Sequence, residues 1–221
     1  MFEGILNIIF PPKCIFCGKL LNYDVKLCIC SDCNPKIPYL RNGKINLIKI
    51  NSYFDDVICI CEYSGIIKDA LIRYKFFNRP SYNMTFAQMM YSKISEMTDW
   101  KNVDIILSVP LHRKKERKRG YNQARLIAKQ LGKLLGIRES QRLLVRTKNT
   151  DSQSLLNRID RLENVKDAFE VSDVSAVRGK SILLVDDILT TGTTLNECCK
   201  VLKKAGADTI TAAVVATGRK Y

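Results

Sequence analysis

The 221-residue sequence has no run of about 18 apolar residues, the length that a helix needs to cross a membrane. Its opening stretch, MFEGILNIIFPP, lacks the basic start and the long apolar core of a secretory signal. These absences favour a cytoplasmic protein without a membrane span. We interpret the opening stretch as an amphipathic helix packed on the protein. A peripheral membrane anchor is the alternative, and it is disfavoured because a short stretch without basic residues binds bilayers weakly.

The sequence also lacks an internal repeat and a low-complexity tract, while 46% of its residues are hydrophobic. A chain of this length can bury a substantial core, but it is too short for several full-sized domains. We therefore expect one main domain at residues 46–221 and a small appendage at residues 1–45. The segment NPKIPYLRNGKIN between them carries two prolines and a glycine, which indicates a link between modules.

Nine cysteines in a cytoplasmic protein argue against a disulfide framework and for a metal site. Cys14 and Cys17 form one C-x-x-C pair, and Cys30 and Cys33 form a second pair after a spacer of twelve residues. Two such turns can aim four thiolates at one Zn²⁺ at about 2.3 Å, and four sulfurs leave no open position, so the zinc would be structural. Cys28 could replace Cys30 as a ligand. Metal binding would supply folding energy that so small a module cannot obtain from apolar burial.

From about residue 52 onward, apolar stretches alternate with amphipathic ones. Strands are predicted in DVICICEYS, VDIIL, SILLVDD and TITAAVVATG, and helices at 66–97 with a break near Pro80, at 121–135 with a stop at Gly136, and at about 193–204. Near-continuous apolar strands between helices predict an α/β fold whose parallel sheet is covered on both faces. The remaining cysteines fall at apolar positions of these elements and are expected to be small buried hydrophobes, namely Cys59, Cys61, Cys198 and Cys199.

The formal net charge of +14 is concentrated in one part of the chain. Between Arg113 and Lys148, thirteen lysines and arginines stand against two glutamates, which leaves a charge of +11 in this window. Charge of this density attracts phosphate-bearing partners, although a solvated helix face explains part of it equally well.

The stretch ILLVDDILTTGTT at residues 182–194 combines two adjacent acids with a threonine-rich turn. We expect the strand to end at the acids and a helix to begin near Thr193. Ligands gather beyond the carboxyl ends of parallel strands, and a helix N-terminus with a nearby glycine favours phosphate. Adjacent carboxylates can accept hydrogen bonds from vicinal hydroxyls or hold a divalent cation, so the stretch fits a ribose 5-phosphate. No lysine follows the glycine, which disfavours an ATP-binding P-loop. An ordinary capped turn is the alternative, but capping needs only one such residue. The candidate binding residues are Asp186, Asp187, Thr190, Thr191, Gly192, Thr193 and Thr194.

This stretch resembles the signature with which type I phosphoribosyltransferases bind 5-phosphoribosyl 1-diphosphate (PRPP). With SVPLHRKKERKRGYNQARLIAKQL, RTKNTDSQSLLNRIDRLENVKDAFEV and the paired cysteines, the whole chain resembles the ComF family. The resemblance implies a zinc module joined to a type I phosphoribosyltransferase fold, with PRPP as ligand and Mg²⁺ on its diphosphate. Members of the competence branch act in natural transformation. For this chain the resemblance implies handling of incoming single-stranded DNA, with a competence helicase or other uptake proteins as partners.

By the same resemblance, Ser108 to Arg113 correspond to the loop that holds the diphosphate, with contacts from Ser108, Pro110, Leu111 and His112. Stabilising the charge of the leaving group contributes most to catalysis in such enzymes. The catalytic residues that the resemblance implies are Asp186, Asp187 and Arg113. His112 is the only histidine. We expect it to contact phosphate or to pack in the loop, because no carboxylate or nucleophile is visibly paired with it.

The segment from Arg146 to Arg158 resembles the flexible loop that closes over substrate in this fold and excludes water. Arg146, Lys148, Gln153 and Arg158 match the family pattern, and Lys148 is a candidate PRPP contact. Lys75 falls where the family usually has a lysine, and a surface lysine on a helix is an equally good interpretation.

Two classes of function remain open from the sequence. The first is a protein that binds PRPP and single-stranded DNA, with a basic face on the DNA backbone and aromatic contacts to its bases. The second is a metabolic phosphoribosyltransferase that moves ribose 5-phosphate from PRPP to an unidentified nitrogenous acceptor; a PRPP sensor without turnover is a weaker third hypothesis. The candidate nucleic-acid contacts are Arg113, Lys114, Lys115, Arg117, Lys118, Arg119 and Tyr121.

Overall fold

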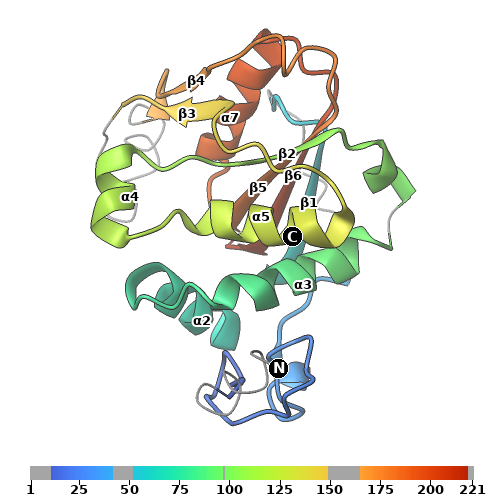
Figure 1. The fold of residues 1–221 in the computed structure, drawn as a ribbon, viewed down its shortest axis with the longest axis vertical. Coiled ribbons are helices and arrows are strands. Elements are labelled where there is room, and N and C mark those ends of the chain that lie inside the picture. The colour runs from blue at the N-terminus through green and yellow to red at the C-terminus, as the bar shows by residue number, and fades with distance from the viewer. Residues whose placement is uncertain (1–10, 42–51, 97, 149–164, 219–221) are drawn as a thin grey trace, which may run out of the picture.

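The computed structural model describes residues 11–41, 52–96, 98–148 and 165–218 of the chain. At its centre lies a four-stranded sheet in the order β1-β6-β5-β2, and all three strand pairs are parallel (Figure 1). The strands are β1 (Asp56–Glu62), β2 (Ile105–Ser108), β5 (Ile182–Leu189) and β6 (Ile210–Thr217). The parallel α/β sheet predicted from the alternating pattern is confirmed.

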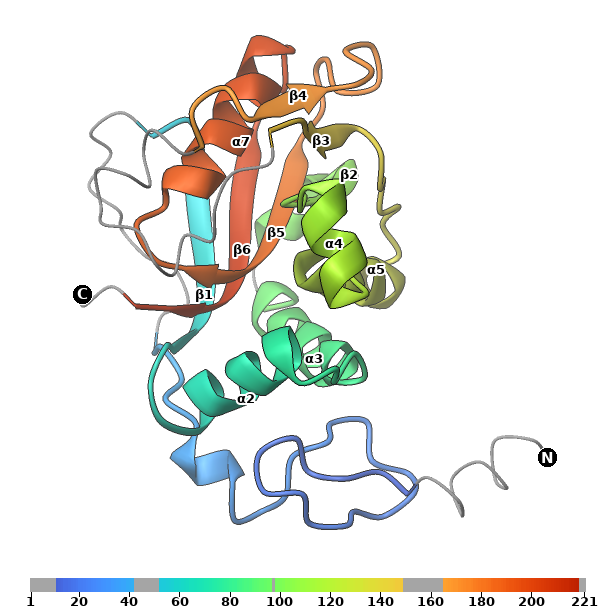
Figure 2. The same cartoon turned by 90° about the vertical axis from the view of Figure 1, so that its left-hand side faces the viewer.

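Helices cover both faces of this sheet, as Figure 2 shows. One face and three helices share one hydrophobic core, and the other face and one helix share a second. The first group comprises α2 (Gly65–Phe76), α3 (Tyr82–Ile94) and α5 (Gln123–Leu135), and the second face carries α7 (Thr193–Lys204). Burying apolar strands on both sides is what holds a parallel sheet together in water. Cys59, Cys61, Cys198 and Cys199 are fully buried in these cores, as predicted.

Local signals set the ends of the helices. Asn122 caps α5 by accepting a hydrogen bond from the Arg125 amide at 3.3 Å, and Gly136 ends it with a left-handed φ of 71°. The predicted helical tract 66–97 is broken around Pro80 into α2 and α3. The remaining short helices are η1 (Asn34–Lys36), η2 (Thr98–Asn102) and α4 (Arg113–Arg119).

The structure corrects the sequence prediction at two strands. β5 does not end at the acids but continues to Leu189, because β6 extends alongside it and Asp186 pairs with Val214. The acids therefore lie inside the last part of the strand. The antiparallel pair of β3 (Leu144–Arg146) and β4 (Phe169–Val171) was not predicted, so the segment expected to be a flexible loop begins with a strand residue. Gln153 and Arg158 lie outside the described residues.

Residues 11–41, which we call the cysteine module, lie beneath α2 and α3, at the opposite end of the molecule from α7 (Figure 2). Its last part, which we expected to be a link, pairs with the sheet: the Leu40 amide donates to Ile60 O and the Glu62 amide to Pro38 O, both at 2.9 Å. The expected helix at residues 1–10 lies outside the described residues. Within the described ranges, no helix combines the length and the hydropathy that a membrane span requires.

Candidate functional site

A cavity of about 1090 Å³ opens at the carboxyl end of β5. Its wall combines the end of that strand and the following turn with the last turn of α2, with α4, and with the start of α5. This is the position at which parallel sheets bind ligands. The candidate residues that line it are Pro110, Leu111, Lys115, Arg117, Lys118, Arg119, Asp186, Asp187, Thr190, Thr191, Gly192 and Thr194.

An ion pair lies at the floor of the cavity. Lys75 Nζ is 2.9 Å from Asp187 Oδ1, and the two side chains are only 22% and 9% exposed. The structure therefore contradicts the interpretation of Lys75 as an exposed surface residue. A buried carboxylate needs such a partner, because leaving a buried charge unpaired costs about 3–5 kcal/mol.

Asp186 has a strongly perturbed acidity. Burial raises its pKa to about 7, and the negative charge of Asp187 adds to the rise. The positive charges of Lys75 and Arg146 and a hydrogen bond from the Asp187 amide at 2.8 Å oppose it. A carboxyl group that titrates near neutrality in a cleft is a common mark of a functional site.

Arg146 supplies the second cation of the cavity floor. It lies at the end of β3, its guanidinium carbon is 5.4 Å from the centre of the Phe169 ring, and its charge attracts Asp186. Burial lowers the pKa of Arg146, while Asp186 and Cys198 act in the opposite direction. Two acids from β5 thus face one cation from α2 and one from β3, and such an arrangement is suited to a polar ligand that carries both hydroxyls and phosphate.

The turn after β5 leads into α7 through Gly192, which has a left-handed φ of 79°. Gly192 caps the helix without a side chain, so the first amides of a twelve-residue helix are not covered by a capping group from that position. Thr191 Oγ1 and Thr193 Oγ1 are 2.9 Å apart, and the Thr193 amide donates to Thr191 Oγ1 at 3.4 Å. A helix N-terminus of this kind stabilises an anion.

The loop between β2 and α4 is fixed by Asn122. Its Nδ2 donates to Val109 O at 3.0 Å, and the Val109 amide donates to Val185 O at 2.9 Å. His112 caps α4, because its Nδ1 accepts a hydrogen bond from the Lys114 amide at 3.3 Å. Among the described residues, the cavity lining does not include Ser108, His112, Arg113, Thr193 or Lys148, all of which the sequence suggested for PRPP.

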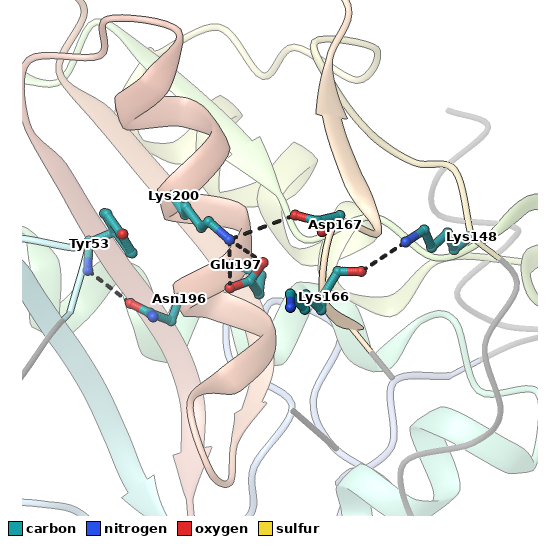
Figure 3. A network of polar contacts seen from close by, with 7 residues as sticks. All are labelled: Tyr53, Lys148, Lys166, Asp167, Asn196, Glu197 and Lys200. Atoms are coloured by element: carbon teal, nitrogen blue, oxygen red, sulfur yellow. Dashed lines mark hydrogen bonds and ion pairs between the residues drawn. The ribbon is translucent and has the colours of Figure 1, made fainter. Parts of the chain in front are cut away.

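Lys148 lies beyond β3 in a separate polar network (Figure 3). Its Nζ donates to Lys166 O at 3.2 Å. The neighbouring Asp167 is 3.8 Å from Lys200 Nζ, which also pairs with Glu197 on α7. The first contact joins the chain after β3 to the chain before β4, and the ion pair of Asp167 joins the latter to α7.

α4 carries six basic residues and one acid in seven positions. The acid, Glu116, is 3.8 Å from Arg125 on α5. Arg119 donates to Gln123 Oε1 at 2.7 Å, and its guanidinium carbon is 5.3 Å from the centre of the Phe76 ring. The sequence prediction missed Phe76, because nothing in its local pattern indicates that it borders the cavity.

The hydroxyl and the ring of Tyr121 both contact another residue of the protein. Its hydroxyl donates to the Tyr74 carbonyl oxygen, and its ring lies tilted against the Tyr74 ring with the centroids 5.8 Å apart. This half-buried residue therefore has a packing role that needs no nucleic acid.

Four successive residues in the last turn of α2 each contact a different part of the molecule. Arg73 Nη2 donates to Ile15 O at 2.9 Å and to Phe16 O at 3.1 Å, within the first cysteine turn. The Tyr74 hydroxyl donates to Gln123 O at 2.9 Å, at the start of α5. Lys75 pairs with Asp187, and Phe76 lies under Arg119. This turn joins the cysteine module to the cavity.

The sulfur atoms of Cys14, Cys17, Cys30 and Cys33 lie within 4.8 Å of one another. Cys17 Sγ and Cys30 Sγ are 3.6 Å apart, close to the separation of about 3.8 Å that follows from tetrahedral geometry with Zn–S bonds of about 2.3 Å. Burial, followed by hydrogen bonding to the neighbouring cysteines, raises the pKa of Cys33 to about 12. The cluster is compatible with a structural metal.

The turns of this cluster favour Cys30 over Cys28. The Gly18 amide donates to Cys14 O at 2.9 Å and the Cys33 amide to Cys30 O at 3.1 Å, which closes both C-x-x-C turns on the same point. Cys28 lies outside the cluster and is hydrogen-bonded to Thr85 on α3.

Comparison with known proteins agrees with this geometry. Residues 82–221 match the family of the phosphoribosyl transferase domain, so the chain contains a phosphoribosyltransferase domain. It is 31% identical to Competence protein F of Haemophilus influenzae over 212 residues, which cover 94% of this chain and 91% of that protein. Competence protein ComFC of Bacillus subtilis is 28% identical over 193 residues, covering 87% and 72%. DNA utilization protein YhgH of Escherichia coli K12 is 26% identical over 157 residues, covering 70% and 68%. The chain belongs to the ComF family, as its sequence predicted.

Proposed function

We propose that the protein binds PRPP and acts in natural competence on incoming single-stranded DNA. One observation carries this proposal: a cavity with two acids and a threonine-rich helix start on its floor is bordered by the most basic helix of the described structure. The names Competence protein F and DNA utilization protein, borne by relatives, support a role in DNA uptake. Uptake proteins such as a competence helicase belong to the same proposal as partners.

Each part of the cavity has a role in holding PRPP. Asp186 and Asp187 accept hydrogen bonds from the ribose hydroxyls or provide oxygen ligands to Mg²⁺. The backbone amides of Thr190 to Thr194 hold the 5-phosphate. A Mg²⁺ ion bound with PRPP would neutralise part of the diphosphate charge. Lys75 pairs with Asp187 and holds its side chain in place. Ser108, His112, Arg113 and Lys148 enter this proposal through the family resemblance alone.

We infer that the four-cysteine cluster holds one structural Zn²⁺ in a module formed by residues 1–45, followed by the phosphoribosyltransferase domain at 46–221. Four converging sulfur ligands, three of them buried, are the chemistry of a structural Zn²⁺ site. The nine cysteines, which all lie in the described ranges, form no disulfide. This supports a cytoplasmic location, where thiols stay reduced.

Calorimetric titration with PRPP and Mg²⁺ tests the site. Charge-assisted hydrogen bonds contribute about 1.5–3 kcal/mol each, so Asp186→Asn with Asp187→Asn should weaken PRPP binding at least about 100-fold. Glu170→Gln, which changes an exposed acid on β4, is the matched control. Unchanged affinity in the double variant would remove the proposal for the sugar phosphate.

Binding of a labelled single-stranded oligonucleotide over a range of salt concentrations tests the DNA function. Replacing Lys115, Arg117 and Lys118 by glutamine should weaken binding and lower the slope of log Kd against log salt by up to about two, because each phosphate contact with a single strand contributes about 0.7. Absence of binding at low salt would favour the metabolic phosphoribosyltransferase instead. Release of pyrophosphate from PRPP, measured with and without the oligonucleotide, tests whether the site turns over.

A further inference from the structure

Two large apolar side chains at the end of α2 are exposed. Phe76 is 62% and Phe77 64% exposed, and both stand just before Asn78, whose positive φ of 48° turns the chain away from the helix. Leaving a phenylalanine side chain in water forgoes about 2 kcal/mol of burial energy. Two adjacent exposed rings therefore indicate a surface that a partner covers.

The surroundings of these rings are strongly basic. The Arg119 guanidinium lies over the Phe76 ring at 5.3 Å and is held in place by Gln123 Oε1 at 2.7 Å. Phe76, Lys115 and Lys118 all border the same cavity. An aromatic face beside guanidinium and ammonium groups is suited to a partner that is aromatic and anionic at once, and a nucleotide meets both conditions.

We propose that Phe76 and Phe77 form a stacking platform for the bases of single-stranded DNA whose phosphates lie along α4. The inference rests on the proposed DNA function and adds the side chains that hold the bases. It replaces Tyr121 in that role, because the Tyr121 hydroxyl and ring are used against Tyr74.

The extent of the positive charge on α4 indicates that single-stranded DNA binds this surface. α4 has seven residues and is therefore about 10 Å long, and its six cations exceed what one phosphate or diphosphate can pair with. A single strand presents several phosphates along that length and also leaves its base faces open for stacking, whereas a duplex keeps them covered. Single-stranded DNA therefore fits both the positive charge of α4 and the exposed rings of Phe76 and Phe77.

The test compares two fluorescent oligonucleotides of about 20 nucleotides, one of thymidine and one of abasic sites, by anisotropy at several salt concentrations. The variants are Phe76→Ala with Phe77→Ala, and Phe76→Tyr with Phe77→Tyr, which keeps both rings. Tyr23→Ala is the matched control, because Tyr23 is an equally exposed ring, 60%, in the cysteine module. Since all these side chains are largely exposed, the substitutions should leave the fold intact, which circular dichroism checks.

The double alanine variant should bind the thymidine strand about 10-fold or more weakly, with an unchanged salt slope, and the abasic strand as the wild type does. The double tyrosine variant and Tyr23→Ala should bind both strands as the wild type does. Undiminished thymidine binding by the alanine variant, or an equal loss for both strands, would overturn the platform while leaving the basic helix as the DNA site. If the alanine variant keeps the DNA affinity but is a smaller oligomer than the wild type by size-exclusion chromatography, the rings form an interface between two copies and the platform is overturned. If the wild type binds neither strand at low salt, the proposed DNA function fails as well.

Discussion

Replacing Asp186 by asparagine should stabilise the free protein, and more so at higher pH. Burial and the charge of Asp187 raise the pKa of Asp186 from 3.8 to about 7. Between these two values the native state binds more protons than the unfolded chain, so the free energy of unfolding falls as pH rises. About three pKa units correspond to about 4 kcal/mol at about 1.4 kcal/mol each. Because Lys75 and Arg146 can adjust and water can enter the cavity, we expect about 2 kcal/mol.

Asparagine keeps the shape of the side chain and removes this proton equilibrium. The variant should be more stable than the wild type by about 2 kcal/mol at pH 8, or about 4–8 °C in Tm. At pH 5 about a third of this difference should remain, because pH 5 lies about one unit above 3.8. Urea unfolding, followed by circular dichroism at pH 5, 6, 7 and 8, gives the difference in the free energy of unfolding between the two proteins. The contributions of all other titrating groups cancel in this difference. Glu170→Gln should show no such trend. A difference that is independent of pH, or that is larger at pH 5, would refute the explanation.

Three further predictions concern the surroundings of the site. Lys75→Met leaves Asp187 buried without its partner and should lower the free energy of unfolding in urea by about 3 kcal/mol; a variant as stable as the wild type would contradict the ion pair. Arg73→Met removes the hydrogen bonds to the first cysteine turn and should weaken PRPP binding about threefold to tenfold by calorimetry, with the metal content unchanged by elemental analysis. Unchanged PRPP affinity would mean that α2 does not couple the cysteine turn to the cavity. A chelator should release about one Zn²⁺ per chain and increase hydrogen exchange in residues 11–41, and protein purified without chelator but free of metal would disprove the zinc site.

The parts of the structure that the sequence predicted depend on local patterns. Apolar strands and helix spacing gave the parallel sheet, Gly136 gave the end of α5, and the two C-x-x-C pairs gave the cysteine cluster. Each of these is decided by residues close together in the chain, where hydrophobic periodicity and turn chemistry dominate.

The parts that it missed depend on contacts between distant segments. β5 runs past the acids only because β6 pairs with it there, and Lys75 becomes a buried partner only when α2 meets the end of β5. The sequence predicts Tyr121 as an aromatic contact for DNA, but it does not indicate that the Tyr121 hydroxyl and ring contact Tyr74 or that Phe76 is exposed. Tertiary packing decides such roles, and no local pattern encodes them.

A crystal structure of the protein soaked with PRPP and Mg²⁺ tests the central claim most directly. We predict the 5-phosphate at the amides of Thr190 to Thr194 and the ribose hydroxyls, or the metal ion, at Asp186 and Asp187. An empty cavity at saturating PRPP, or PRPP bound at another place, would contradict the account.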